Sequence, residues 1–433
     1  HLPGEPDLRT GLDHLVELGV NTVQLLPVMD FENDETSPAY NWGYMPVHFN
    51  APDGWYASDP VGPARVVELK RMIDGFHRHG LKVVLDVVLN HTAEKAPEKV
   101  FSFEGIVPGY YYRHWPDGTP ANGSACGNEF RSEAPMARRF LLETLRHWVR
   151  DYGVDGFRFD LMGLIDLETL TLMARELRTL NPELLLYGEP WAAGASPMAI
   201  TGKGAQRGRG FGVFNDGYRD AIKGGVFDAT PGFVQGGERR GEIRGGLLGG
   251  VDEFAAGPLE AIAFVECHDN ATLHDRLVKT TRGRTDVTDD DRRAMQRLAG
   301  ALVLLAPGIP FLHAGQEMAR TKGGHENSYN APDSVNAIRW SWKKREAELV
   351  AYHQGLIALR RAHPLFRPAD AETLRRDRRW LEEVTGQPSP AGVVGQVIAR
   401  GDSGDAWEAA CLVFSSAAEP VELALPPGAW RVY

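Results

Sequence analysis

Short apolar runs rich in β-branched residues alternate with amphipathic stretches along most of the chain, and this alternation constrains the fold more than any other feature. Such alternation is typical of parallel strands joined by crossover helices. The sequence predicts strands over 21–28, 82–90, 154–162, 184–190, 212–216, 261–269 and 310–317. Apolar residues at helical spacing predict helices over 8–19, 64–80, 137–153 and 167–180, of which the first three end at a glycine.

Repeated strand-helix units over this length predict an α/β fold, the (β/α)8 TIM barrel, in which functional groups lie at the carboxyl ends of the strands. Seven predicted strands are one fewer than a barrel needs. The chain opens in a helix just before the first of them, so we expect the first barrel strand to lie ahead of His1. We therefore expect a barrel over 1–364 that is truncated at its N-terminus.

The pattern changes after about residue 365 to short segments of alternating polarity, which favour antiparallel strands. These segments cover 392–400, 409–415 and 420–426. We expect a small β-sandwich-like domain over 365–433, truncated at its C-terminus. The arginine-rich stretch 373–380 is interpreted as a solvated surface of this region.

Composition excludes several classes of protein. The chain has 433 residues, of which 43% are hydrophobic and 24% charged, and no apolar run is long enough to span a membrane. A net charge of -11 argues against nucleic-acid binding, which requires a basic surface. The three cysteines, Cys126, Cys267 and Cys411, are far apart and indicate neither a disulfide framework nor a zinc site.

Charged and polar residues stand at the ends of four predicted strands. They are Asp86, Asn90 and His91, then Arg158 and Asp160, then Glu189, and finally His268 and Asp269. Any one of them could be a satisfied core group or a cap. Because the carboxyl ends of parallel strands meet at one end of a barrel, four strands ending this way predict a shared polar site.

The stretch VDGFRFDLMG (154–163) shows this pattern most clearly. Side chains two apart on a strand point the same way, so Arg158 and Asp160 are expected on one face. Phe157, Phe159 and Leu161 are expected on the other face, toward the helices. Burying such charges costs several kcal/mol per ion unless they are paired, so the pair is expected to face a pocket.

Three carboxylates that converge in a partly desolvated pocket cannot all remain ionised at little cost, so at least one should have a raised pKa and donate a proton. That combination suits glycoside hydrolysis by a retaining mechanism, which needs one nucleophilic carboxylate and one acid. Arg158 would keep Asp160 ionised. Metal-assisted hydrolysis would instead need closely spaced ligands such as HExxH, which the sequence lacks.

Four motifs, DVVLNH, GFRFDLMG, YGEPW and VECHDN, resemble the four short sequence regions of the α-amylase family of glycoside hydrolases, in their usual order. YNWGY (40–44) resembles the additional signature of the type I pullulanases, which hydrolyse α-1,6 linkages in pullulan, starch or glycogen-derived glucans. DLMGLIDLET (160–169) and GHENSYNAPD (324–333) strengthen that resemblance. It covers nearly the whole chain.

The resemblance implies Asp160 as nucleophile, Glu189 as general acid/base and Asp269 as the carboxylate that stabilises the transition state. It implies that Tyr40 stacks on the sugar, although YNWGY alone also reads as a turn anchored by buried aromatic rings. The substrate-binding residues implied are Tyr40, Asn41, Trp42, Asp86, His91, Arg158, Trp191, His268, Asn327 and Tyr329.

Two other functions remain open on the sequence. The same three carboxylates occur in α-1,4-acting hydrolases and in branching transferases, because bond choice depends on the surrounding subsites. A silent glucan-binding scaffold is less favoured, since such a protein has no physical need for three carboxylates in one pocket.

The expected partner is an α-glucan polysaccharide or oligosaccharide, with neither nucleic acid nor a membrane, and we expect a monomer. No cofactor is required by the proposed chemistry. The wider family often binds calcium, sometimes through the residue matching Asn90, so calcium is left open and no metal ligands are assigned. The compartment is left open between cytoplasm and exterior, with the cytoplasm as the working expectation.

Overall fold

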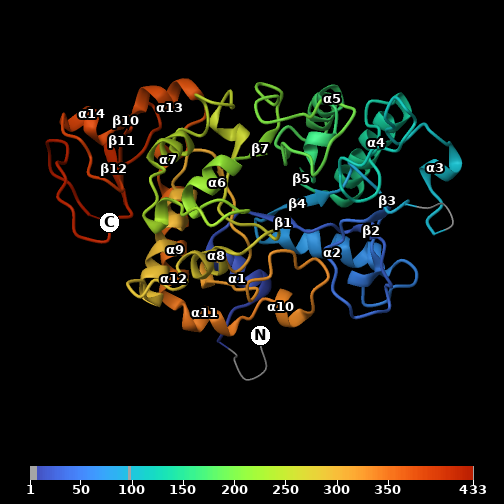
Figure 1. The fold of residues 1–433 in the computed structure, drawn as a ribbon, viewed down its shortest axis with the longest axis horizontal. Helices are drawn as coiled ribbons and strands as arrows, with labels where there is room; N and C mark the ends of the chain where they lie inside the picture. The colour runs from blue at the N-terminus through green and yellow to red at the C-terminus, as the bar shows by residue number, and fades with distance from the viewer. Residues whose placement is uncertain (1–6, 96–98, 433) are drawn as a thin grey trace. The chain divides into compact units, whose positions relative to one another are not determined.

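The computed structural model describes residues 7–95 and 99–432 (Figure 1). The chain forms two compact units. Unit A comprises Val20–Phe214 with Tyr329–Pro332, and unit B comprises the described parts of His1–Gly19, Asn215–Ser328 and Asp333–Tyr433. Each unit contains parallel strands, which are described for each unit in turn.

Unit A is built on five parallel strands in the order β1-β4-β5-β6-β7. They are β1 (Thr22–Leu25), β4 (Lys82–Val87), β5 (Gly156–Phe159), β6 (Leu185–Gly188) and β7 (Gly212–Phe214). The helices are α2 (Ala64–Arg78), α3 (Phe103–Ile106), α4 (Pro135–Tyr152) and α5 (Leu167–Arg178). An antiparallel pair, β2 (Met29–Phe31) and β3 (Pro46–Pro52), follows β1.

Local sequence explains where these elements begin and end. The β4 strand is buried over nearly its whole length, as expected of a parallel strand covered on both faces. The α4 helix buries Leu141, Leu145 and Trp148 on one face, and the Trp148 indole donates to the carbonyl of Phe49 at 2.9 Å. Gly153 ends α4 with φ of 70°, a left-handed conformation that only glycine adopts at little cost.

Unit B contains the parallel pair β8 (Ala261–Ala263) and β9 (Ile309–Pro310). Its antiparallel sheet consists of β10 (Arg378–Trp380), β11 (Val393–Ala399) and β12 (Ala409–Ser415). The longer helices are α1 (Gly11–Leu18), α6 (Asp216–Lys223), α7 (Arg240–Leu247), α8 (Leu273–Thr280), α9 (Asp289–Leu304) and α12 (Ala347–Ala362). The shorter ones are α10 (Asp333–Asn336), α11 (Ser341–Arg345), α13 (Ala371–Asp377) and α14 (Leu381–Thr385).

Single turns of 3₁₀ helix occur in both units. They are η1 (Gly54–Tyr56), η2 (Met162–Leu164), η3 (Phe233–Gln235), η4 (Pro258–Glu260), η5 (Gln316–Met318) and η6 (Pro364–Phe366). Two of them, η2 and η5, follow strands β5 and β9 within a few residues. No helix over the described ranges combines the length and the apolar character that a membrane span requires.

Each of the seven strands predicted for the barrel overlaps an observed strand, and the four predicted helices are observed as α1, α2, α4 and α5. These are the parts of a (β/α)8 barrel, followed by a small antiparallel β region as predicted. The strands are shorter than predicted, because several predicted runs continue into the polar loops that follow them. The eighth barrel strand and the boundary at residues 364 and 365 stay predictions.

Three expectations were wrong in detail. The run 310–317 contributes only Pro310 to a strand, since the chain then turns into η5. The segment 420–426 forms no strand. Arg378, expected on a solvated surface, is 5% exposed and donates to Gln396 Oε1 at 2.9 Å, because β10 pairs with β11 there.

Candidate active site

Arg158 organises a buried cluster of carboxylates in unit A. In the parallel register of β4 and β5, Arg158 lies opposite Asp86, so both side chains point to the same face of the sheet. Arg158 Nη1 donates to Asp86 Oδ1 at 2.9 Å and to Asp160 Oδ1 at 3.1 Å, and Nη2 donates to Glu189 Oε1. The arginine side chain is 3% exposed. One guanidinium therefore gathers three carboxylates from three neighbouring strands.

Asp160 stands directly after β5 and is held from two sides. Its backbone N–H donates to the carbonyl of Val87 at 3.1 Å, which continues the parallel pairing by one residue. Asn90 Nδ2 donates to Asp160 Oδ2 at 2.9 Å, while Arg158 occupies Oδ1. The Asp160 side chain remains 13% exposed. Its carboxylate is thus fixed in orientation and still reachable.

Glu189 stands directly after β6, and its environment favours the protonated form. Burial, followed by the negative charge of Asp160, raises the pKa of Glu189 to about 8, against the opposing attraction of Arg158. The backbone N–H of Leu161 donates to Glu189 Oε2 at 2.9 Å. The side chain is 13% exposed. Glu189 is therefore the candidate for the carboxyl group that was predicted to donate a proton.

The backbone turns sharply after Asp160, which corrects one expectation. The β5 strand ends at Phe159, and Leu161 has φ of 36°, so it is not the outward-facing strand residue that the alternation predicted. This turn aims the Leu161 N–H at Glu189. Two residues later, Gly163 donates its N–H to the carbonyl of Glu189 at 3.0 Å. A Cβ on Gly163 would lie 2.5 Å from the carbonyl oxygen of Trp191, so only glycine fits.

Asp86 belongs to the cluster but differs from the other two carboxylates, because it is fully buried. Burial and the charge of Asp160, opposed by Arg158, bring its pKa to about 6. Tyr44 donates its hydroxyl to Asp86 Oδ2 at 2.6 Å. The sequence interpretation missed Tyr44 as a site residue, although it ends the YNWGY motif and was available there.

His91 connects the loop after β4 to the YNWGY motif by hydrogen bonds. Its Nδ1 lies 2.6 Å from Asn90 Oδ1, and its Nε2 lies 2.7 Å from the carbonyl oxygen of Tyr44. Asn90 in turn donates to Asp160, so His91 supports the position of that carboxylate through Asn90. The ring is 1% exposed, and burial lowers the pKa of His91.

The rest of the YNWGY motif forms an aromatic turn in unit A. Asn41 Oδ1 accepts the N–H of Gly43 at 2.9 Å, and Gly43 has φ of 90°. The Trp42 N–H donates to the carbonyl of Tyr329 at 3.0 Å, with the two rings edge to face at 6.4 Å. The Tyr40 ring packs edge to face on Trp55 at 6.2 Å.

Exposure separates the aromatic residues of this turn. Trp42 is 7% exposed and acts as the anchor of the turn, whereas Tyr329 is 46% exposed. Tyr40 is half-buried. The structure therefore brings Tyr329, one of the predicted binding residues, to the motif. Trp191 is also half-buried and follows Glu189.

The remaining predicted residues lie in unit B. His268 and Asp269 follow β8, and Asp269 is exposed with Oδ1 accepting the N–H of Asn270 at 2.8 Å. Two buried lysines hold this loop: Lys322 Nζ donates to the carbonyl of His268 at 2.7 Å, and Lys223 Nζ donates to that of Ala271 at 3.4 Å. Asn327 is exposed in the loop that precedes Ser328.

A calcium site is not assigned. Within the described ranges, Asp30, Glu35 and Asp53 bring carboxylate oxygens within 4.8 Å of one another. Arg65 already donates to both oxygens of Glu35, at 2.7 Å each, and Asp53 accepts backbone N–H groups, so this cluster is explained without a cation. The side-chain amide of Asn90 already bonds Asp160 through Nδ2 and His91 through Oδ1. Calcium binding stays a prediction.

The raised pKa of Glu189 has a consequence for stability. A carboxyl group whose pKa rises from 4.5 to about 8 on folding contributes stability that is full below pH 4.5 and is lost as pH rises through 8. Glu189→Gln removes this loss. We expect its melting temperature, relative to wild type, to increase from pH 5 to about pH 8 and to level off above that. Thermal unfolding at pH 5, 7 and 9 measures this, and a difference independent of pH would contradict it.

The chain is similar to known proteins in sequence and in structure. No model of a protein family matches the chain. The chain is 41% identical over 432 residues to the pullulanase of Bacillus subtilis (strain 168), a match covering 96% of this chain and 58% of the relative.

Two solved structures are similar over nearly the whole chain. The pullulanase from Paenibacillus barengoltzii, in complex with maltohexaose and α-cyclodextrin, has a TM-score of 0.91 at 41% identity and covers 97% of this chain and 66% of that one. The pullulanase from Bacillus acidopullulyticus has a TM-score of 0.88 at 43% identity and covers 93% of this chain and 49% of that one. The chain thus spans roughly half to two thirds of the length of these relatives, and the predicted fold is confirmed.

Proposed function

Because the chain belongs to the pullulanase family of glycoside hydrolases, we propose that it hydrolyses α-1,6-glucosidic branch linkages in pullulan, starch or glycogen-derived glucans with retention of configuration. The observation that carries the proposal is the pair of bonds that the Arg158 guanidinium donates to Asp160 and Glu189. It holds Asp160 and Glu189 in one cluster, where Glu189 retains a proton to about pH 8. A retaining glycosidase needs these two partners, one ionised and one protonated.

The reaction begins when an Asp160 oxygen attacks the anomeric carbon of the sugar at the branch. The bond to the O6 oxygen of the neighbouring glucose breaks, and the proton of Glu189 moves to that oxygen. This leaves a glycosyl ester on Asp160. Glu189, now ionised, takes a proton from water as the water oxygen attacks the anomeric carbon, and Asp160 is released as a carboxylate.

Arg158 contributes in both halves of the reaction. Its guanidinium bonds the Asp160 carboxylate before attack, and its positive charge favours the ionised form of Glu189 after proton transfer. Asp86 balances part of that charge from the buried side. Asp269, from unit B, is proposed to stabilise the positively charged sugar at the transition state, a role that rests on the family resemblance.

The choice of the α-1,6 bond rests on the relatives and on the YNWGY turn. All three relatives described above are named pullulanases. The half-exposed Tyr329 and the half-buried Tyr40 supply ring faces suited to the apolar side of a pyranose. We propose that these rings bind the glucan chain next to the cleavage point.

Digestion of pullulan by the purified protein tests the proposal. Pullulan consists of maltotriose units joined by α-1,6 bonds, so the expected product is maltotriose, identified by chromatography with mass detection. Panose would show cleavage at α-1,4 bonds and would contradict the bond assignment. Longer branched products from linear α-1,4-glucan would indicate a branching transferase. The Asp160→Asn variant serves as the blank.

A further inference from the structure

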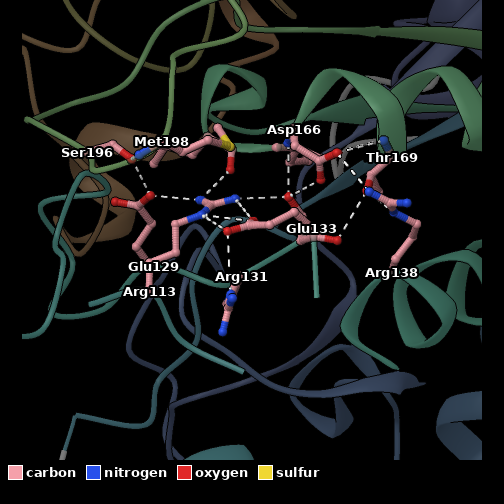
Figure 2. A network of polar contacts seen from close by, with 12 residues as sticks. Arg113, Glu129, Arg131, Glu133, Arg138, Asp166, Thr169, Ser196 and Met198 are labelled. Carbon is pink, nitrogen blue, oxygen red and sulfur yellow. Dashed lines mark hydrogen bonds and ion pairs between the residues drawn. The ribbon is translucent and has the colours of Figure 1, made fainter. Parts of the chain in front are cut away.

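A second buried ion pair in unit A takes no part in the chemistry proposed above (Figure 2). It joins Arg113 to Glu129, whose side chains are 3% and 0% exposed. Both belong to the segment 110–134, between α3 and α4. Figure 2 shows the Arg113 guanidinium between Glu129 on one side and Glu133 on the other, with Ser196 next to Glu129.

Arg113 uses all five of its N–H donors. Nη1 donates to Glu129 Oε1 at 2.7 Å and to the carbonyl of Leu164 at 2.8 Å. Nη2 donates to Ser132 Oγ at 3.0 Å and to Glu133 Oε2 at 2.7 Å, and Nε donates to the same carboxylate. A fixed planar fork is needed for this set, which a lysine ammonium cannot reproduce.

Glu129 is the matching acceptor. It accepts the Ser196 hydroxyl at 2.5 Å on Oε1 and the N–H of Gly123 at 2.9 Å on Oε2. The carbonyl of Gly123 then accepts the N–H groups of Ala193 and Gly194, at 3.0 and 2.8 Å. The carboxylate therefore holds the segment that follows Glu189 both through Ser196 and through Gly123.

The two ends of this ion pair bond the segments that follow Asp160 and Glu189. Leu164 lies four residues after Asp160, and Ser196 lies seven residues after Glu189. The segment 110–134 also contacts the loop after β4, because the Phe130 N–H donates to the carbonyl of Asn90 at 2.8 Å. Resting on the proposed function, we propose that Arg113 and Glu129 are positioning residues that set the geometry of Asp160 and Glu189 through these loops.

Energetics favour a positioning role over simple stabilisation. Replacing a buried ion pair by well-packed apolar residues is often neutral or stabilising, so such a pair is weak evidence for stability alone. What an apolar pair could not do is fix three loops through directed hydrogen bonds. Through Leu164, Arg113 secures the η2 turn, which begins directly after Leu161, and the Leu161 N–H donates to Glu189. Loosening this turn removes a donor that lowers the pKa of Glu189.

Arg113→Lys tests the role while keeping the charge. We expect kcat on pullulan to fall by about 10²-fold with little change in KM, because a small misplacement of reacting groups has an effect of that order. We also expect the alkaline limb of the pH profile of kcat to move to higher pH, as Glu189 loses the Leu161 donor. Ser196→Ala, which leaves the ion pair intact, should lower kcat by a smaller factor in the same direction.

Arg360→Lys is the matched control. Arg360 is 9% exposed and donates to the carbonyls of Leu304, Ala306 and Gly308, so its replacement removes a buried guanidinium that holds the end of α9 and the start of β9, not the segments after Asp160 and Glu189. We expect it to lower the melting temperature and to leave kcat and the pH profile unchanged. If Arg113→Lys and Ser196→Ala behave like this control, the positioning role is refuted. If wild type itself yields no maltotriose, the proposed function fails instead.

Discussion

Replacing Asp160 by asparagine is expected to lower turnover on pullulan by about 10⁴-fold or more, because covalent catalysis has no alternative route of similar barrier once the nucleophile is lost. Asparagine keeps the size of the side chain, and its amide oxygen can still face Arg158 or Asn90. The folded structure should therefore persist. Release of reducing sugar from pullulan, followed for hours at high protein concentration, measures the residual rate.

Asp155→Asn is a control drawn from the same strand. Asp155 precedes β5 at its amino end, is 18% exposed against 13% for Asp160, and bonds His77 and the N–H of Val83, each at 2.8 Å. Its replacement is expected to affect stability and not turnover. Ordinary activity in the Asp160→Asn variant would refute the nucleophile assignment.

Replacing Glu189 by glutamine is expected to lower turnover on pullulan by about 10³-fold, within the range typical of a lost general acid. The loss should depend on the leaving group. A maltotriosyl fluoride needs no proton to release fluoride, so the variant should form the Asp160 ester rapidly and show a burst of fluoride. The second step should then be slow, because no base activates water. Added azide, which needs no base, should restore turnover and give an α-maltotriosyl azide.

Glu183→Gln provides the comparison for this variant. Glu183 lies just before β6, at the opposite end of the strand from Glu189, and its side chain is 76% exposed in an ion pair with Lys82. It should behave as wild type with both substrates. A Glu189→Gln variant that loses pullulan and fluoride activity equally, without response to azide, would contradict the acid/base assignment.

The sequence was sufficient for the strands of the barrel and for the carboxylates at their ends. Strand-helix alternation predicts that β4, β5 and β6 are parallel neighbours. Parallel pairing then brings Asp86, Arg158 and Glu189, which directly follows β6, to one end of the sheet. The pairing of Arg158 with Asp160 also followed from their spacing. Site residues whose positions depend on strand order and on spacing along one strand can therefore be predicted from the sequence.

Contacts between distant loops were not readable. Tyr44 bonds Asp86 across 42 positions, and Arg113 bonds Leu164 across 51, with no periodic pattern to indicate either. The turn at Leu161 was missed because alternation along β5 was extended past the end of the strand. The segment 110–134 has isolated bridges and turns instead of regular strands or helices, so no propensity argument could place Arg113 and Glu129.

The shared guanidinium of Arg158 makes the carboxylate positions epistatic. Because Asp86, Asp160 and Glu189 all bond the same side chain, a change in one of them alters the charge that the other two experience. Free-energy effects of substitutions within such a network do not add. A second carboxylate replacement should therefore change stability by an amount that depends on the first, and the three positions are constrained to vary together as a set.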